Sequence, residues 1–402
     1  MSFGQSLSGL NAAAKNLDVI GNNIANSATV GYKSGSITFS DMYSSSMIGL
    51  GVNVSGISQD FRSGTLSSTG NQLDMAIDGD KGLFVLQNNE GALMYSRNGQ
   101  FFPDSLNRVV NAQGQQLMGY APGGTNLVGL QIPEVNLAPQ ASTTLDNRVN
   151  LDASVPAIPA AVAFDADDSS TYSNVVPVTV YDSLGNKHRL MQYYTKREAA
   201  GGMAQWEVNF TLDGQAPDGG TGMLLSFDSA GALNPATPST ATISFVGLEV
   251  NGAPVDDLAI LVDYGESTQY SSGFTQGFRV DGYASGEFSS ISIATNGEMT
   301  AHYTNGQKSV IGNVVLADFN NVLGLQSVGG NAWVESGASG QPIFGIPGSN
   351  GLGAIMGQMV EESNVDISKS LVDMIMAQRT YQANAQSIKT QDQMMQTLIT
   401  MR

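Results

Sequence analysis

Hydrophobic and polar positions along this chain follow a helical pattern at both ends and a β pattern between them. Near the N-terminus, apolar or small residues recur in steps of four and three. They are Phe3, Leu7, Leu10, Ala14, Leu17, Gly21 and Ile24. The same spacing returns near the C-terminus at Leu371, Met374, Gln378, Tyr381, Ala385, Ile388, Asp392, Met395 and Ile399. Such a repeat makes a narrow stripe along a helix, here called the seam, and a seam needs a partner helix.

The pattern predicts a first helix over residues 1 to about 26 and a second that begins after the capping residues 363–366 and continues to the C-terminus. Two such helices either pair as an ordinary coiled coil packed on the chain's own domains, or belong to a helical layer shared by many copies. The small and polar seam residues Gly21, Gln378 and Asp392 weaken a simple coiled coil. They suit a close-packed layer, in which polar side chains meet polar neighbours.

The segment after the first helix, residues 28–71, is rich in Gly, Ser and Thr, and we expect it to be extended and mostly irregular. Short β patterns follow it. Leu83–Leu86 and Ala92–Tyr95 flank the turn sequence Asn88–Gly91, which is the pattern of a β-hairpin. The sequence therefore predicts a β domain that begins near residue 72.

A second β region spans residues 143–279. Val178–Tyr181 and Leu190–Tyr194 flank a turn, and residues 206–212 alternate as in a half-buried strand. Six basic and sixteen acidic residues lie in this region, and 6 − 16 gives −10 of the chain's net charge of −18. This concentration of charge favours a well-solvated, outward-facing domain.

Short strand patterns resume after residue 279, and a Gly- and Ser-rich stretch leads to the final helix. The expected fold class is mainly β and multi-domain, with α-helical termini that pair in a coiled-coil-like layer and with nested insertions. We expect a terminal helical core (1–27 and 364–402), an extended linker region (28–71 and 345–363), an inner β domain (72–142 and 280–344) and an outer β domain inserted in it (143–279).

Composition excludes several classes of function. The net charge of −18 and the pI of about 4.3 argue against a nucleic-acid partner. The 402 residues include no Cys, so disulfide and thiolate chemistry are absent. No apolar run is long enough to insert in a membrane. The N-terminus lacks the basic and apolar regions of a cleavable signal peptide, so we expect a cytoplasmic protein or export that reads an uncleaved N-terminus.

Candidate catalytic, cofactor and metal sites find little support. The acidic residues Asp165, Asp167 and Asp168 lack the Gly and Glu that a calcium loop needs at its sixth and twelfth positions. His188 and His302 are the two histidines, and they lie in different β regions without a nearby Cys or second His. We therefore expect no enzyme activity, no cofactor and no metal.

Three stretches of the chain resemble one family, the bacterial flagellar rod and hook proteins. Residues 17–33, LDVIGNNIANSATVGYK, resemble its N-terminal signature. Gly82–Leu86 with Tyr95–Phe101 resemble its inner β domain, and residues 361–384 resemble its C-terminal helix. Rod proteins have little like residues 143–279, so the outer domain points to the hook branch of the family.

The resemblance implies a structural subunit that polymerises into a flexible helical tube, a universal joint that carries motor torque from rod to filament. The seam residues would form the polymerisation interface in the core of the tube. The implied partners are copies of the same chain, the hook cap, the distal rod, the hook–filament junction proteins and the flagellar type III export apparatus. The implied location is the extracellular hook attached to the basal body, reached without a cleaved signal peptide.

Two alternatives stay open at this stage. A distal-rod-like axial protein would form a stiffer tube. A secreted β-rich adhesin or enzyme with helical oligomerisation ends would form a defined oligomer with a polar pocket, whereas the hook interpretation predicts open-ended polymers.

Overall fold

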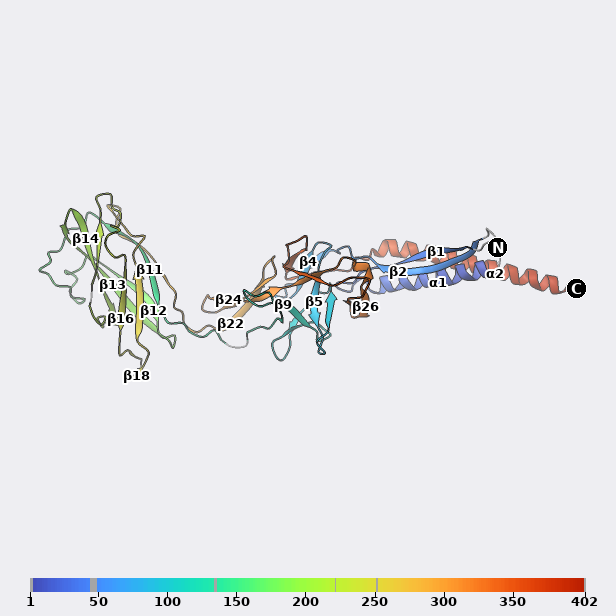
Figure 1. The fold of residues 1–402 in the computed structure, drawn as a ribbon, viewed down its shortest axis with the longest axis horizontal. Coiled ribbons are helices and arrows are strands. Elements are labelled where there is room, and N and C mark those ends of the chain that lie inside the picture. Colours follow the sequence, from blue (N-terminus) through green and yellow to red (C-terminus); the bar gives the residue numbers. More distant parts are fainter. Residues whose placement is uncertain (1–2, 44–48, 134–135, 221, 251, 401–402) are drawn as a thin grey trace. The chain divides into compact units, whose positions relative to one another are not determined.

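The computed structural model describes residues 3–43, 49–133, 136–220, 222–250 and 252–400. It has an α-helix at each end and β structure between them (Figure 1), so the predicted fold class is confirmed. The chain divides into two compact units. Unit 1 comprises Met1–Glu134, Ser289–His302 and Lys308–Arg402, and unit 2 comprises Val135–Phe288 and Tyr303–Gln307.

The helices of unit 1 match the predicted spans. Helix α1 covers Phe3–Ala25 and helix α2 covers Ile367–Thr400, and they run antiparallel side by side (Figure 1). Asp366 caps α2, because its carboxylate accepts a hydrogen bond from the Lys369 amide at 3.0 Å. Neither described helix is long and apolar enough to cross a membrane.

The segment after α1 differs from the expectation of mostly irregular structure over residues 28–71. Strands β1 (Gly35–Tyr43) and β2 (Gly49–Gln59) form a long antiparallel hairpin beside α1. The hairpin sequence shows little alternation of apolar and polar residues, because Gly and Ser occupy many positions. Two irregularities in the register also interrupt the strand pairing. Contact with α1 helps to order the hairpin, for example where Asn23 exchanges hydrogen bonds with the Gly35 backbone at 2.8 Å.

The rest of unit 1 is an inner β region whose main described sheet has thirteen strands. The first half of the chain contributes β3 (Leu66–Ser68), β4 (Met75–Asp78), β5 (Leu83–Gln87), β6 (Leu93–Ser96), β7 (Phe102–Pro103), β8 (Val109–Val110), β9 (Gln116–Tyr120) and β10 (Leu127–Gly129). The second half contributes β22 (Phe288–Ile293), β23 (Glu298–Tyr303), β24 (Lys308–Val314), β25 (Leu316–Asp318), β26 (Gln326–Gly329), β27 (Ala332–Val334), β28 (Ile343–Gly345), β29 (Ala354–Gly357) and β30 (Met359–Glu361), with a short 3-10 turn at Val322–Gly324.

Pairing in this region joins the two halves of the chain. The predicted hairpin over residues 83–95 is confirmed as β5 and β6. The short strand patterns expected after residue 279 include two that Val315 separates, β24 and β25. Strands β29 and β30, in the expected linker 345–363, pair with β4 and β3. The core beneath them includes Phe84, Met299 and Leu316, all fully buried.

Unit 2 packs two sheets face to face around one apolar core. One sheet holds β16 (Thr240–Phe245), β19 (Leu258–Asp263), β11 (Thr144–Asp152), β20 (Thr268–Tyr270) and β21 (Thr275–Val280). The other holds β12 (Asn174–Tyr181), β13 (Lys187–Ala200), β14 (Met203–Leu212) and β15 (Gly222–Phe227), and β17 (Glu249–Val250) pairs with β18 (Ala253–Pro254). The β12–β13 pair confirms the predicted hairpin, and Trp206 of β14 is fully buried in the core.

The two ends of the expected outer domain, residues 143–279, lie side by side within unit 2. Leu145 pairs with Val280 across β11 and β21. Beyond them the Asp281 carboxylate accepts hydrogen bonds from the Thr143 and Thr144 amides, at 2.8 and 2.9 Å. Adjacent boundaries are what an inserted domain requires.

Acid should weaken this boundary. Burial alone would raise the pKa of Asp281, but hydrogen bonds from Thr143 and Thr144 outweigh it and hold that pKa below its ordinary value. Its stabilising contribution is therefore full above the unfolded-chain pKa of about 3.9 and is lost as the pH falls through the folded-state pKa. We expect Asp281→Asn to destabilise unit 2 by about 1 kcal/mol at neutral pH, and by less near pH 3.

Urea unfolding followed by Trp206 emission, in a Trp333→Phe background, measures this difference. Trp206 is buried in unit 2, so its emission reports that unit alone. An equal loss of stability at both pH values would show that the Asp281 charge is not responsible.

Candidate assembly site

The contact between α1 and α2 is built from small side chains. On α1, which packs on β1 and β2 as well as on α2, the buried residues are Ser6, Ala12, Ala13, Ile20 and Asn23, and the described part of α2 buries Ala377 alone. Small residues let two helix backbones approach closely. A Cβ placed on Gly9 would lie 3.0 Å from the Asn384 side chain, which shows how tight the contact is.

The predicted seam is a different face of these helices. None of its residues is buried within the chain. The exposed members are Phe3, Leu7, Leu371, Gln378, Tyr381, Asp392, Met395 and Ile399, and the half-buried ones are Leu10, Ala14, Leu17, Gly21, Ile24, Met374, Ala385 and Ile388. At about 100° per residue, the seam on α1 lies about 110° around the helix from its buried face, and the seam on α2 lies about 70° from the stripe of Ala377 and Asn384, which Met395 of the seam also joins. The helices therefore do pair, but not through the seam.

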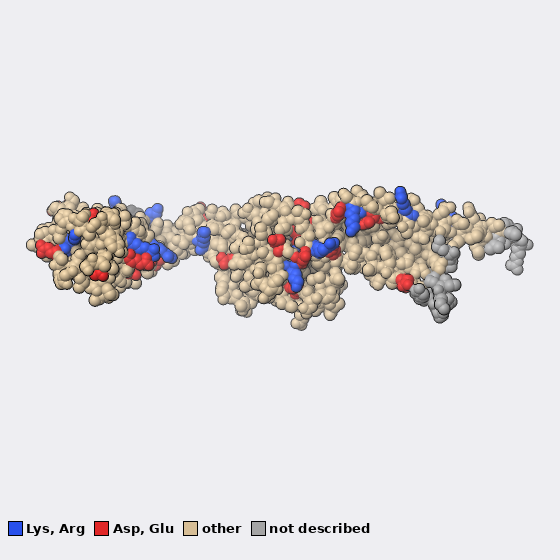
Figure 2. Space-filling model, turned by 90° about the horizontal axis from the view of Figure 1, so that it is seen from above, with Lys and Arg blue, Asp and Glu red and all other residues tan. Residues whose placement is uncertain are grey.

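Charged side chains are sparse over the surface that the seam occupies. Helix α1 carries two charged residues, Lys15 and Asp18, outside the seam, and Asp392 is the one charged residue of the seam. Most of the face of the whole molecule in Figure 2 is likewise formed by residues that are neither acidic nor basic. An exposed apolar stripe with few charges is typical of a surface that is covered in an assembly.

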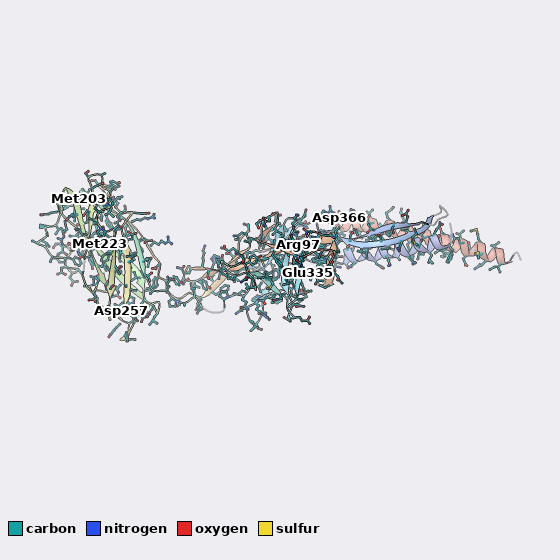
Figure 3. All side chains as sticks on the ribbon, in the orientation of Figure 1. Arg97, Met203, Met223, Asp257, Glu335 and Asp366 are labelled. Carbon is teal, nitrogen blue, oxygen red and sulfur yellow. The ribbon has the colours of Figure 1, made fainter. Side chains whose placement is uncertain are left out.

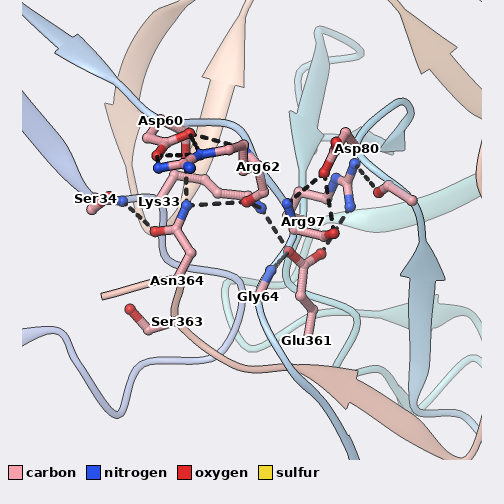
Figure 4. A network of polar contacts seen from close by, with 12 residues as sticks. Lys33, Ser34, Asp60, Arg62, Gly64, Asp80, Arg97, Glu361, Ser363 and Asn364 are labelled. Carbon is pink, nitrogen blue, oxygen red and sulfur yellow. Dashed lines mark hydrogen bonds and ion pairs between the residues drawn. The ribbon is translucent and has the colours of Figure 1, made fainter. Parts of the chain in front are cut away.

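A buried ionic cluster, centred on Glu361, lies where the helices join the inner β region (Figure 4). The Lys33 ammonium lies 2.6 Å from Glu361 Oε1, and the Arg97 Nη1 lies 2.9 Å from Oε2. Oε1 also accepts a hydrogen bond from the Gly64 amide at 2.8 Å. The Lys33 and Glu361 side chains are fully buried and Arg97 is 2% exposed.

Further hydrogen bonds enclose the cluster. Lys33 also donates to the Arg62 carbonyl at 2.7 Å, and Arg97 donates to the Gly79 carbonyl at 2.9 Å. Asn364, predicted as a possible helix cap, instead donates to the Asp60 and Arg62 carbonyls and accepts from the Ser34 amide. The backbone just before α2 is thereby tied to the two segments that flank the β1–β2 hairpin.

The electrostatics show which charges are costly. Burial lowers the pKa of Lys33, and although the Glu361 carboxylate opposes that shift, the nearby Arg97 adds to it. At the edge of the cluster, the hydrogen bond from the Arg62 side chain lowers the pKa of Asp60. Glu361 is thus the anion that lets two cations remain buried.

The cluster joins the start of α2, the chain after α1 and the inner β region into one body. Arg97 belongs to the inner β region and Asp366 to the beginning of α2, and both are labelled in Figure 3. Buried charge-assisted hydrogen bonds therefore link the helices to the inner region in addition to the backbone.

Sequence reasoning missed the three charged residues of this cluster. Lys33, Arg97 and Glu361 each lie inside one of the three stretches that carry the family resemblance, which was the available signal. Nothing in their spacing connects them, because 328 positions separate Lys33 from Glu361.

The two histidines considered as candidate sites each contact polar side chains of their own β region. His188 lies between two carboxylates, 2.8 Å from Asp213 and 3.3 Å from Asp182. His302 lies 2.7 Å from the Ser292 hydroxyl on the neighbouring strand. Among the described residues, no three His, Asp or Glu side chains form a group that could hold a metal ion.

Comparisons with known proteins agree on one family. Family models match as Flagella basal body rod protein over residues 6–33, Flagellar hook protein FlgE/F/G D1 domain over 76–153, Flagellar basal body protein FlaE D2 domain over 150–283 and Flagellar basal body rod FlgEFG protein C-terminal over 356–401.

Curated relatives match over the full length. The Flagellar hook protein FlgE of Salmonella typhimurium is 41% identical over 416 residues and that of Escherichia coli K12 is 40% identical over 426, with 100% of each chain covered. The crystal structure of the Helicobacter pylori flagellar hook protein FlgE2 matches with a TM-score of 0.57 at 16% identity, over 73% of this chain and 100% of that one. That likeness supports the fold.

Removing the central anion should loosen the junction. In Glu361→Gln, Lys33 and Arg97 stay buried without a negative partner, which typically costs about 3–5 kcal/mol. We expect a lower melting temperature for unit 1 and faster proteolysis between residues 26 and 70. The matched control is Arg62→Gln, whose side chain is 80% exposed and should matter little. Equal melting of both variants and the native chain would show that the cluster does not hold the junction.

Proposed function

The chain belongs to the flagellar hook protein family and is a structural subunit of the hook of the bacterial flagellum, and from this we propose that the seam on α1 and α2 is its polymerisation interface. Subunits of this family polymerise with copies of themselves, and the hook serves motility. The observation that carries the proposal is that the α1–α2 pair leaves every seam residue exposed or half-buried.

The energetics favour covering these side chains. Phe3, Leu371, Met395 and Ile399 are 56%, 47%, 60% and 72% exposed in the single chain. Burial of a large apolar side chain contributes about 1.5–3 kcal/mol, so a layer of many copies gains substantially along two seams per subunit. The polar seam residues Gln378 and Asp392 limit the fit and would favour one register of neighbouring helices.

We propose a mechanical division of labour within the tube. The terminal helices form its core and resist twisting, and the Glu361 cluster passes torque to the inner β region. The outer domain, residues 143–279, faces outward and slides past its neighbours as the hook bends. Its −10 charge keeps it solvated and opposes tight fusion of adjacent outer domains.

We further propose partners beyond self-assembly. The hook cap, the distal rod and the hook–filament junction proteins would contact the growing or finished ends of the tube, and the flagellar type III apparatus would export the chain without cleaving it. We expect no catalytic activity. The rod alternative is not favoured, because relatives that match the chain over nearly its full length are hook proteins.

A charge on the seam should block assembly and spare the monomer. Leu371→Asp would place an unpaired carboxylate in the packed layer, at a cost of several kcal/mol per subunit. Leu371 is 47% exposed, whereas Ile388 is half-buried and therefore less suitable for this test. We expect an unchanged thermal melt of the monomer with loss of polymers in electron micrographs and loss of motility. The control Ala383→Asp, on the exposed opposite side of α2, should polymerise.

Normal polymers of Leu371→Asp would remove the seam from the interface. An early melt of its monomer would show instead that Leu371 supports the fold of the single chain.

Excision of the outer domain should change bending and keep assembly. Gln140 and Tyr283 exchange two backbone hydrogen bonds of 3.0 Å, so an Asn-Gly turn can join them after deletion of residues 141–282. We expect polymers whose bending stiffness, measured from their curvature in electron micrographs, differs from that of native tubes. Unfolding of unit 1 in this variant, seen by circular dichroism, would contradict the nested arrangement.

A further inference from the structure

A groove runs along α1, between α2 and the β1–β2 hairpin. Its volume is about 650 Å³. Ala13 and Ile20 of α1, Met376 and Ala377 of α2, and Ile37 and Phe39 of β1 supply its apolar lining. From Gly9 to Asn23 the lining follows α1 for roughly 21 Å, at about 1.5 Å per residue. The groove is therefore long enough for three to four turns of another helix.

Helix α2 is longer than its partner. It has 34 residues against 23 in α1. The two helices are antiparallel, and Asn384 lies beside Gly9, so the start of α1 at Phe3 is level with about residue 390 of α2. Residues 392–400, here called the overhang, extend past α1 by roughly 14 Å (Figure 1).

The overhang continues the stripe of α2 that packs on α1. Positions 377, 384 and 391 follow a seven-residue spacing along that stripe, and Met395 continues it beyond the end of α1. Residue 391 is half-buried, whereas Met394, Met395 and Ile399 are 58%, 60% and 72% exposed. Helix α1 covers this stripe of α2 up to about residue 390. Along the overhang, no described residue of α1 covers it.

We propose that the groove of one subunit receives the α2 overhang of a second copy of this chain. This inference rests on the proposed polymerisation through the terminal helices, and it names the surface that would receive Met395 and Ile399, the last two residues of the α2 seam. The overhang is about 14 Å long and the groove about 21 Å, so one fits lengthwise in the other.

The chemistry of the two surfaces agrees. The groove combines Ala, Ile, Met and Phe with small polar side chains, and Asp373 is the one charged residue among those that line it. The overhang combines Met and Ile with Gln and Thr, and its charged residue, Asp392, lies beside the stripe rather than at its centre. At about 100° per residue, Asp392 lies about 60° from Met395 and about 20° from Ile399, so Met395 can enter the groove and leave water while the Asp392 charge stays at the groove edge.

The geometry also explains open-ended growth. An overhang at one end of a helix pair and a groove along the same pair are different surfaces, so the contact is heterologous. Each subunit that fills a neighbour's groove leaves its own groove open for the next one. Such a contact continues without closing, as a tube requires.

Cysteine crosslinking tests the contact directly, because the chain has no Cys of its own. One subunit carries Met395→Cys in the overhang. A second, of distinguishable mass, carries Asn16→Cys or Thr380→Cys in the groove, which place a thiol on α1 and on α2 respectively. The control partner carries Asp18→Cys, exposed on α1 and outside the groove lining. Equal mixtures are polymerised, oxidised and separated on a non-reducing gel.

The expected result is a covalent heterodimer with at least one groove variant and none with the Asp18→Cys control. Because each subunit has a single thiol, a heterodimer can form only between two copies. Polymers in which neither groove position crosslinks, or in which the Asp18→Cys control crosslinks equally, would overturn the groove contact. Either result would leave the seam proposal standing. Failure of the unmodified chain to polymerise would count against the proposed polymerisation itself.

Discussion

The two ends of the chain are held together by one buried carboxylate. Glu361 accepts charge-assisted hydrogen bonds from Lys33 and Arg97, and its own carbonyl accepts the Gly31 amide at 2.7 Å. An uncompensated buried charge here would cost several kcal/mol. The segments that carry Lys33, Arg97 and Glu361 must therefore come together during folding. The junction ties the chain just before α2 to the segments that flank the β1–β2 hairpin. The inner β region is tied to the helices by the same contact.

Because the α1–α2 contact uses small side chains, it leaves the larger apolar residues of the two helices exposed for other contacts. Ala12, Ala13 and Ala377 let the backbones approach closely and bury little apolar area. The large apolar residues lie on other faces, where a single chain leaves them partly in water. A subunit built in this way keeps enough contacts to align its ends and reserves its larger apolar surfaces for copies of itself. This is the physical logic that connects the fold with a polymeric structural role.

The outer domain follows a different principle. Its two sheets share one apolar core of their own, with Trp206, Phe210 and Ile260 almost or fully buried, so its insertion requires only adjacent chain boundaries. The inner β region instead depends on strands from both halves of the chain, and its pairing is therefore non-local. One unit can be inserted in the other because the insertion point carries a two-stranded pair and not a buried core.

The sequence by itself determined the features that depend on local periodicity. Both helices, the hairpins of residues 83–95 and 178–194, and the nested order follow from spacings of seven, of two and of turn residues, which act over a few positions. The tertiary structure alone decided which face of each helix is buried, the hairpin over Gly35–Gln59, and the meeting of Lys33, Arg97 and Glu361. A seven-residue stripe says that a helix needs a partner but not whether that partner belongs to the same chain. Charges separated by 264 and 328 positions leave no local pattern, because their attraction acts only after the fold has brought them together.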